Sequence, residues 1–212
     1  QDHKRVLEGD KGKNTGGMGA YSPSRLESES LNKKIINKII NPTLKGLKEL
    51  NSNFVGFLYA GLMIENNEPY LIEYNVRMGD PECQTILPKL KTDFFNILKA
   101  CTDKNLHAIK IDWKIEKSLC IVLCSKGYPE KYENNIVINN LNKITLKNNE
   151  YIFHAGTKEN KMRVMSNGGR VLNFVILSED FKLSRNKAID LIKQINWSNG
   201  FFRKDIGFKV IN

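Results

Sequence analysis

Apolar residues in the first half of the chain follow a helical period. Between residues 31 and 50, leucine and isoleucine recur every three or four positions, and Asn41-Pro42 interrupts them. Because asparagine caps helices well and proline suits the first helical position, this pattern predicts two consecutive helices or one kinked helix. A second helix is predicted over residues 93–103, with an inner face made of Phe94, Ile97, Leu98 and Cys101.

Two β-prone segments between these helices predict a hairpin. Residues 56–64 and 70–76 are rich in apolar side chains, and Asn66 and Asn67 between them are typical of a turn. Side chains alternate between the two faces of a strand, so Glu73, Asn75 and Arg77 are expected on one face. The second strand is thus predicted to present three polar groups together.

The pattern changes near residue 109. Short β-prone runs follow at residues 119–124, 136–138, 151–155, 162–165 and 171–177, with turn-forming residues between them. One helix is predicted over residues 180–195. We therefore predict an α+β fold with two domains, residues 1–110 and 111–212.

Composition excludes several classes of protein. The 212 residues suffice to bury a core, and no apolar run approaches the roughly 20 residues of a membrane span. The basic, polar start of the chain lacks the apolar core of a signal peptide, so we expect a cytoplasmic location and no membrane partner. The four cysteines form neither a metal-type pair nor a disulfide framework, which predicts reduced thiols.

The charge balance changes this picture little. There are 33 basic and 23 acidic residues, a net charge of +10, which raises the possibility of a nucleic-acid partner. The lysines are scattered, however, and no basic stripe alternates with aromatic residues. We predict no nucleic-acid partner, although the charge would attract phosphorylated small molecules.

Residues 72–82 gather several groups that suit phosphate chemistry. Glu73 and Asn75 offer two hard oxygen ligands, which fit a Mg²⁺ ion otherwise held by water and phosphate oxygens. The planar guanidinium of Arg77 suits a carboxylate or an acyl phosphate, although a structural salt bridge is an alternative. Asp80 and Glu82 are candidates to hold an amine or ribose hydroxyls.

A glycine-rich segment at residues 8–23 is the second candidate. Its glycines permit positive φ angles and close approach of the backbone, so consecutive N–H groups are expected to converge on an anionic oxygen. It is not a Walker loop, because no Gly-Lys-Ser/Thr ends it. A purely structural turn is the alternative.

These segments together resemble the phosphoribosylamine-glycine ligase family, ATP-grasp ligases of purine synthesis. The likeness is colinear and covers essentially the whole chain. It rests on residues 2–5, 14–23, 42–47, 59–63, 73–84, 153–157, 167–172 and 203–207.

The resemblance implies that this chain is a carboxy-terminal half. It would hold the carboxy-terminal part of the ATP-grasp domain, an antiparallel sheet with helices, followed by a small, mostly β domain with a helix. The family uses ATP to phosphorylate the glycine carboxylate, and the amine of 5-phosphoribosylamine attacks the glycyl phosphate to give glycinamide ribonucleotide, ADP and phosphate. The implied cofactors are ATP and Mg²⁺ or Mn²⁺. The implied partners are the two substrates and a missing amino-terminal half, without which the chain is expected to be inactive.

The resemblance also implies roles for individual residues. Glu73 and Asn75 would ligate the metal, Leu71 would contact the nucleotide, and Arg77 and Asp80 would be catalytic. Substrate contacts are implied for Asp2, His3, Lys4, Arg5, Asn14, Gly16, Gly17, Met18, Gly79, Pro81 and Glu82.

Some alternatives stay open at this point. His3 fits the role of orienting a neighbour better than that of a catalytic base, because an amine that attacks an acyl phosphate needs little basic assistance. Arg170, Arg203 and Lys204 either reach a phosphate or stabilise the second domain. The whole chain is alternatively part of another ATP-grasp carboxylate-amine ligase, or a non-catalytic module that binds a phosphoribosyl group.

Overall fold

The computed structural model describes residues 1–211 and divides into two compact units. Unit 1 contains residues 1–23, residues 80–89 and the described residues from Lys114 onward, and unit 2 contains residues 24–79 and 90–113. The two units divide the chain differently from the predicted domains, because residues 1–23 and 80–89 cluster with the carboxy-terminal segment. The domain boundary at residue 110 stays a prediction.

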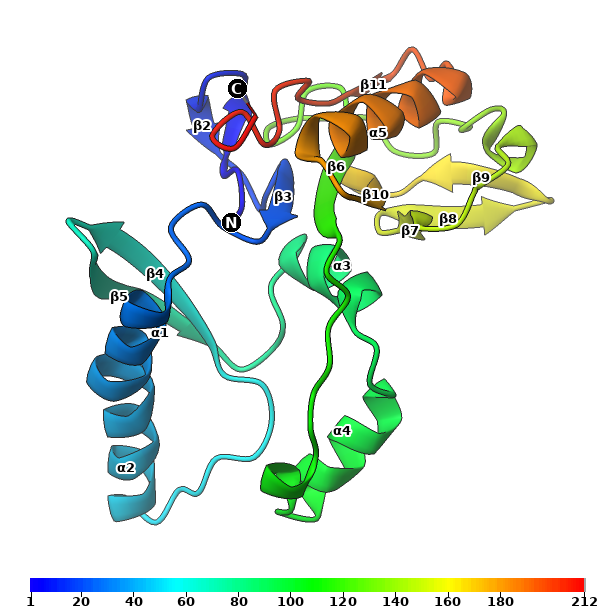
Figure 1. Ribbon diagram of the computed structural model, residues 1–212. Coiled ribbons are helices and arrows are strands. Elements are labelled where there is room, and N and C mark those ends of the chain that lie inside the picture. The colour runs from blue at the N-terminus through cyan, green and yellow to red at the C-terminus, as the bar shows by residue number, and fades with distance from the viewer. Residues whose placement is uncertain (212) are drawn as a thin grey trace. The chain divides into compact units, whose positions relative to one another are not determined.

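An antiparallel five-stranded sheet forms the centre of unit 1 (Figure 1). Its strands are β3 (Gly19–Ser22), β6 (Lys117–Ser125), β7 (Glu150–His154), β10 (Arg170–Ser178) and β11 (Gly200–Phe201). β6 pairs with β3, β10 and β11, and β10 also pairs with β7. The sheet therefore joins the start of the chain to its carboxy-terminal half.

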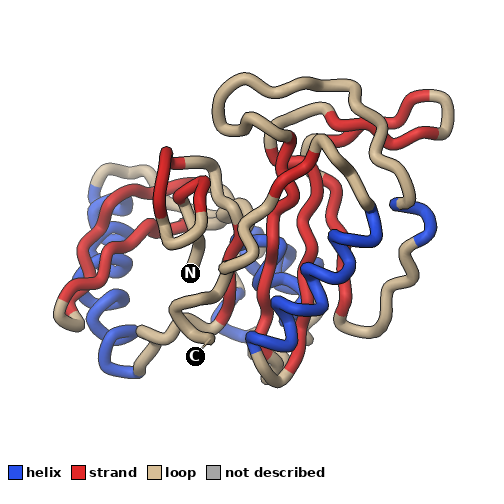
Figure 2. Tube along the Cα trace, turned by 90° about the horizontal axis from the view of Figure 1, so that it is seen from above, coloured by secondary structure: helices blue, strands red, loops and turns tan. Residues whose placement is uncertain are grey.

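Helices cover this sheet. α5 (Phe181–Ile195) and α3 (Glu82–Ile86) both contact β6 and β10, and Figure 2 shows α5 lying across the strands. Asp180 caps α5 by accepting a hydrogen bond from the Leu183 N–H. Nearly every residue of β6 and β10 is buried, which explains why both read as apolar runs without alternation, with Asn173 as the one polar residue inside the run of β10.

Two small ribbons complete unit 1. β1 (Arg5–Leu7) pairs with β2 (Lys11–Asn14), and β8 (Thr157–Asn160) pairs with β9 (Arg163–Ser166). 3₁₀ turns occupy Leu87–Lys89 and Leu141–Lys143. The strand predicted over residues 136–138 is wrong: only an isolated bridge forms, from Val137 to Met165, because left-handed Asn135 and Asn140 bend the chain on either side.

Unit 2 begins with a long helical segment. α1 (Glu29–Ile35) continues through π-helical Ile36–Ile40 into α2 (Asn41–Glu49). The Asn41 N–H donates to the Ile36 carbonyl five residues back. Pro42 lacks an N–H and would crowd the preceding turn, so the wider π turn keeps the helical segment continuous, which lies within the two predicted alternatives. Asn41 is therefore helical rather than a cap.

The predicted hairpin is confirmed in unit 2. β4 (Tyr59–Glu65) pairs with β5 (Glu68–Asn75), and Asn66 and Asn67 form the turn with φ of 49° and 60°. Positive φ at both positions matches the type I′ hairpin turn, which asparagine tolerates. A β-bulge leaves Ile72 without a partner, since Leu62 pairs with Leu71 and Gly61 with Glu73.

The second predicted helix is also confirmed. α4 (Phe94–Thr102) has Asp93 as its cap, and a 3₁₀ turn follows at Leu106–Ala108. Its predicted inner face needs one correction, because Leu98 is exposed and Ala100 is buried. These two residues lie at opposite edges of the stripe centred on Ile97 and Cys101, and the edge with Ala100 is the one covered.

Two features concern the chain as a whole. All four cysteines are free, and burial raises the pKa of Cys124 to about 12. No helix within residues 1–211 has the length and apolar composition needed to cross a bilayer.

Candidate active site

The loop between β2 and β3, residues 15–18, has all its backbone N–H groups engaged; we call it the glycine loop. The acceptors are the Lys4 carbonyl for Thr15 (2.7 Å), Tyr128 Oη for Gly16 (2.9 Å), Thr15 Oγ1 for Gly17 (3.0 Å) and the His3 carbonyl for Met18 (2.9 Å). The expected cradle of N–H groups around an anion is therefore wrong for this loop, because each donor already has a protein acceptor.

Close packing explains the glycines instead. Gly17 has φ of 127°, and a Cβ there would lie 2.4 Å from Pro81 Cδ. A Cβ on Gly16 would lie 2.9 Å from the guanidinium carbon of Arg170. Both distances are shorter than real Cβ contacts, so glycine lets the Asp80-Pro81 segment and the Arg170 side chain approach the loop.

Arg170, on β10, joins the glycine loop to Asp80. Its Nη1 donates to the Gly16 carbonyl at 3.0 Å and to the Asp80 carbonyl at 2.8 Å, and its Nη2 donates to Asp80 Oδ2 at 2.9 Å. Gln84 Nε2 donates to the other carboxylate oxygen, Asp80 Oδ1, at 2.9 Å. The Asp80 carboxylate is thus oriented from two sides, while its side chain stays 44% exposed.

Met18 and Asn14 differ sharply in accessibility. Met18 is fully buried in the core, its sulfur lies 3.8 Å from Cys124 Sγ, and its carbonyl accepts from the Val122 N–H. Its N–H is also engaged, so Met18 has a packing role in this structure, and its implied substrate contact stays a prediction. Asn14 ends β2 and is exposed. Its implied substrate contact stays a prediction.

The cationic side chains of residues 2–5 lie at the surface of unit 1. Lys4 Nζ pairs with Asp2 Oδ2 at 2.9 Å, and Arg5 Nη1 donates to the Gly12 carbonyl at 2.8 Å. Lys4 and Arg5 are exposed and so are accessible to an anionic ligand. Their implied contacts stay predictions.

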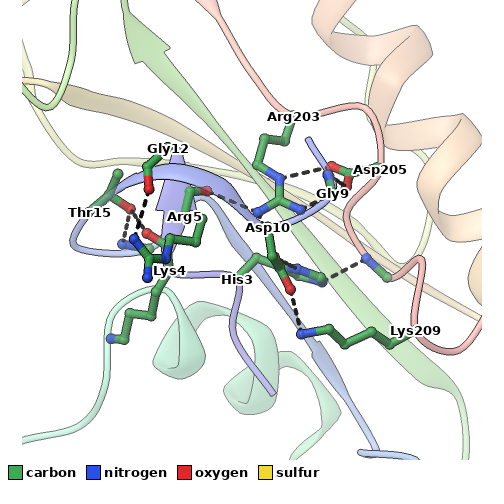
Figure 3. A network of polar contacts seen from close by, with 12 residues as sticks. His3, Lys4, Arg5, Gly9, Asp10, Gly12, Thr15, Arg203, Asp205 and Lys209 are labelled. Atoms are coloured by element: carbon green, nitrogen blue, oxygen red, sulfur yellow. Dashed lines mark hydrogen bonds and ion pairs between the residues drawn. The ribbon is translucent and has the colours of Figure 1, made fainter. Parts of the chain in front are cut away.

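Arg203 centres a buried polar network that fixes this amino-terminal segment (Figure 3). Its guanidinium, 1% exposed, binds Asp205 through Nε and Nη2 at 2.8 and 2.7 Å. Its Nη1 donates to Asp10 Oδ1 and to the Arg5 carbonyl, both at 2.9 Å. Arg203 is therefore engaged on all sides, which favours the stabilising role left open for it.

His3 belongs to the same network and has both ring nitrogens engaged. Nε2 accepts from the Gly207 N–H at 3.0 Å, so the ring proton sits on Nδ1, which donates to Asp10 Oδ1 at 3.2 Å. Burial lowers the pKa of His3, and the hydrogen bond to Asp10 opposes this shift only in part. Although burial raises the Asp10 pKa, hydrogen bonds from Lys209, Arg203 and His3 hold it well below its usual range. The geometry favours a positioning role for a neutral His3.

The metal-ligand candidates lie in unit 2. Asn75 Nδ2 donates to Glu73 Oε1 at 3.3 Å, so both side chains share one face of β5 as predicted. No cluster of three His, Cys, Asp or Glu ligands exists among residues 1–211. Two hard oxygen donors still fit a magnesium ion that takes its remaining ligands from water and phosphate.

The absence of a side chain at Gly61 leaves room for the Glu73 side chain. It pairs with Glu73 across the hairpin, and a Cβ there would lie 3.0 Å from Glu73 Cγ. Without that Cβ, the carboxylate lies over the backbone of β4. Leu71, the implied nucleotide contact, is exposed on β5.

Arg77 lies outside the strand. β5 ends at Asn75, so strand alternation no longer places Arg77 on the face of Glu73, and the shared face of these two residues stays a prediction. Arg77 is exposed, and its Nη1 donates to the Met78 carbonyl at 2.9 Å. No carboxylate salt bridge to Arg77 is found among the described residues, which leaves its planar group available to an anion.

The remaining candidates are divided between the units. Gly79 is the buried last residue of the first segment of unit 2, while Pro81 is buried and Glu82 begins α3 in unit 1. Sequence reasoning missed Tyr128 and Gly61. Tyr128 lies between Gly127 and Pro129, among the turn-forming residues that follow the run at 119–124, and such residues do not indicate a site. The bulge at Ile72 shifts the strand register, so the sequence did not reveal the pairing of Gly61 with Glu73.

Comparisons with known proteins agree with this arrangement. Residues 1–83 match the phosphoribosylglycinamide synthetase ATP-grasp (A) domain, and residues 118–209 match the C domain of the same enzyme. The chain belongs to the phosphoribosylglycinamide synthetase family. The two matches follow one another in the order expected from the sequence.

Relatives extend this family match. A phosphoribosylamine–glycine ligase from Fusobacterium nucleatum is 43% identical over 98% of this chain and 49% of its own length. A chloroplastic one from Arabidopsis thaliana is 43% identical over 100% of this chain and 40% of its own length. The crystal structure of the Thermotoga maritima phosphoribosylamine–glycine ligase superposes with a TM-score of 0.82 at 33% identity, covering 98% of this chain and 50% of that one. The chain thus spans about half the length of the relatives it matches.

Proposed function

We propose that the polypeptide containing this chain ligates glycine to 5-phosphoribosylamine at the expense of ATP, giving glycinamide ribonucleotide, ADP and phosphate. The observation that carries this proposal is the ordered match of one chain to both the ATP-grasp domain and the C domain of one synthetase. Relatives from bacteria and a plant carry the corresponding ligase name. Another ATP-grasp ligase is a weaker candidate, because it would not explain the C-domain match.

The residues suit the chemistry of phosphoryl transfer to a carboxylate. Such transfer brings anions together, so the protein has to position them and neutralise charge. Glu73 and Asn75 would hold Mg²⁺ or Mn²⁺, which neutralises phosphate charge when bound. The fork of Arg77 would orient the substrate carboxylate or its acyl phosphate.

Asp80 would act on the other substrate. Arg170 and Gln84 each bind one of its carboxylate oxygens, and both oxygens keep accepting capacity. An amine or a ribose hydroxyl would donate to the exposed edge of the carboxylate. Hydrogen bonding of this kind orients the amine of 5-phosphoribosylamine for attack on the glycyl phosphate.

The location and the partners belong to the same proposal. The cytoplasmic location stays a prediction, since the plant relative is named as chloroplastic. An amino-terminal half of the same polypeptide would supply the adenine end of the nucleotide site. We expect the isolated 212-residue chain to release no ADP from ATP, glycine, phosphoribosylamine and Mg²⁺.

A substitution at the metal pair tests the proposal. In the whole polypeptide, ADP release should require both glycine and phosphoribosylamine, and Glu73→Ala should lower the rate on the order of a hundredfold because a charge-stabilising group is lost. Glu65→Ala, an exposed carboxylate on the same hairpin, is the matched control and should retain the rate. A Glu73→Ala enzyme with normal rate and normal magnesium dependence would falsify the metal assignment.

A further inference from the structure

Two side chains from the carboxy-terminal segment, Tyr128 and Arg170, bind the glycine loop through the two peptide groups that flank Gly16. The Gly16 N–H donates to Tyr128 Oη at 2.9 Å, and the Gly16 carbonyl accepts from Arg170 Nη1 at 3.0 Å. Tyr128 lies in the turn after β6, and Arg170 begins β10. Both backbone groups of this exposed glycine are thereby fixed by side chains more than a hundred residues away in the sequence.

The same guanidinium also fixes Asp80. Arg170 reaches the Asp80 carbonyl through Nη1 and the Asp80 carboxylate through Nη2, at 2.8 and 2.9 Å. Because the guanidinium is planar and rigid, its three acceptors must keep a set distance and orientation. The glycine loop and Asp80 are therefore held in register by one side chain, and a lysine could not reproduce this geometry.

Tyr128 and Arg170 are positioned together. Gly169, which precedes Arg170, packs closely against the Tyr128 ring, and a Cβ there would lie 2.1 Å from Tyr128 Cδ2. Tyr128 therefore needs glycine at position 169 to reach the loop. Gly169 leaves room for the Tyr128 ring, whose hydroxyl binds the Gly16 N–H. Arg170 supplies the donor to the Gly16 carbonyl.

Asp80 and Gly16 are more exposed to solvent than Arg170, which binds them. The Asp80 side chain is 44% exposed and Gly16 is exposed, whereas the Arg170 side chain is only 21% exposed. A ligand would therefore reach Asp80 and Gly16 more readily than Arg170. This arrangement favours an indirect role for Arg170.

We propose that Arg170 and Tyr128 are positioning residues for phosphoribosylamine, acting through Gly16 and Asp80. The identity of the substrate rests on the proposed function. An interaction that binds the substrate equally in its ground state and its transition state raises KM when it is lost, so the positions of the two segments that would contact phosphoribosylamine matter even where Arg170 and Tyr128 touch no substrate.

Hydrogen–deuterium exchange tests the positioning without any assumption about the reaction. In the whole polypeptide, Arg170→Gln and Tyr128→Phe should each raise the exchange rate of the peptide covering residues 14–18 at least about tenfold, since each removes one of the two hydrogen bonds that hold Gly16 and so lets the loop open more often. Arg163→Gln, an exposed arginine on β9 of the same unit, is the control and should leave that peptide unchanged. Unchanged exchange in Arg170→Gln would overturn the proposal.

Steady-state kinetics tests the consequence for the substrate. Arg170→Gln should raise the KM for phosphoribosylamine about tenfold to a hundredfold and leave the KM for ATP unchanged. Arg170→Lys should keep the defect, because a point charge cannot bridge three oxygens, and Tyr128→Phe should show a smaller rise in KM. A purely structural role would instead lower the active fraction, and hence kcat, with KM unchanged; that result would overturn the proposal.

The two proposals fail in distinguishable ways. If the unmodified polypeptide releases no ADP in response to glycine and phosphoribosylamine, the proposed function is wrong, and the exchange rates still decide whether Arg170 holds the loop. If the unmodified polypeptide is active and Arg170→Gln has an unchanged KM for phosphoribosylamine, the positioning role is wrong and the ligase function stands.

Discussion

The two compact units differ in how many of their apolar side chains are buried. In unit 1, the strands β6 and β10 and the inner face of α5 form one buried cluster that includes Phe174, Ile176 and Leu191. Among the described residues of unit 2, only Leu31, Ile39 and Ala100 are buried apolar residues. Most of the large exposed apolar side chains belong to unit 2, among them Leu50, Phe95, Met63, Ile72 and Val76.

Sheet width explains this difference. Unit 1 has five paired strands with helices against them, so its central strands can be covered on both faces. Unit 2 has a single hairpin, and a two-stranded ribbon buries too little apolar surface for independent stability. Unit 1 is therefore the more buried part, and it holds Asp80 and the glycine loop, whereas Glu73 and Asn75 lie on the less buried hairpin.

The largest expected effect comes from truncating matched phenylalanines. Phe174→Ala in unit 1, where the side chain is fully buried, should lower the free energy of unfolding by about 3–5 kcal/mol, because it removes apolar contact and leaves a cavity. Phe95→Ala in unit 2, where the side chain is 70% exposed, should change it by less than about 0.5 kcal/mol.

Each unit contains one tryptophan, which makes the comparison measurable. Urea unfolding followed by Trp197 fluorescence in a Trp113→Phe background reports unit 1, and Trp113 in a Trp197→Phe background reports unit 2. Equal losses of stability from the two phenylalanine substitutions would contradict the difference in burial.

The sequence predicted the elements of both units better than their assembly. Runs such as residues 119–124 and 171–177 predicted strands because they are short, mostly apolar and contain several β-branched residues, and both strands formed. Nothing local indicated that Gly19–Ser22 pairs with β6, since that pairing joins segments far apart in the chain. Long-range pairing depends on tertiary packing, and the periodicity of apolar residues along the sequence does not reveal which distant segments pair.

The candidate site shows the same limit. The Glu73 and Asn75 pair was predictable because two-residue alternation is a local rule, but Arg77 was not, because the strand ends before it. The glycines were predicted to let backbone N–H groups converge on an anion, but these N–H groups bond to protein acceptors, and Gly16 and Gly17 leave room for Arg170 and Pro81. A glycine in the sequence indicates that another group packs closely against the backbone, but it does not indicate whether that group is a ligand or another part of the protein.

Acid should affect unit 1 before unit 2. The folded-state pKa of His3 lies below its ordinary value of 6.5, so folding disfavours its protonation. This contribution to stability is complete above pH 6.5 and is lost as pH falls through the folded-state pKa. In unit 2, hydrogen bonds from Lys34 and Lys38 lower the pKa of Glu68 to about 2, so its contribution is lost only between pH 4.5 and about pH 2.

Unfolding at two pH values checks this order. Between about pH 7.5 and about pH 5, the stability reported by Trp197 should fall and that reported by Trp113 should change less. His3→Gln should flatten the dependence in unit 1, because it removes the titrating ring. A steeper fall in unit 2 over this interval would contradict the assignment of the shift to the His3 network.

The smallest expected effect concerns glycine, and it should have opposite signs in the two units. Gly46 lies in α2 of unit 2, where a Cβ would have nothing within 4 Å, so Gly46→Ala should stabilise unit 2 by about 0.5–1 kcal/mol through higher helix propensity. Gly19 lies in β3 of unit 1, where a Cβ would lie 2.5 Å from the Cys120 carbonyl oxygen, so Gly19→Ala should destabilise unit 1. Urea midpoints from the two tryptophan backgrounds separate these changes. A loss of stability in Gly46→Ala would show that unit 2 packs more tightly around α2 than its exposed apolar residues indicate.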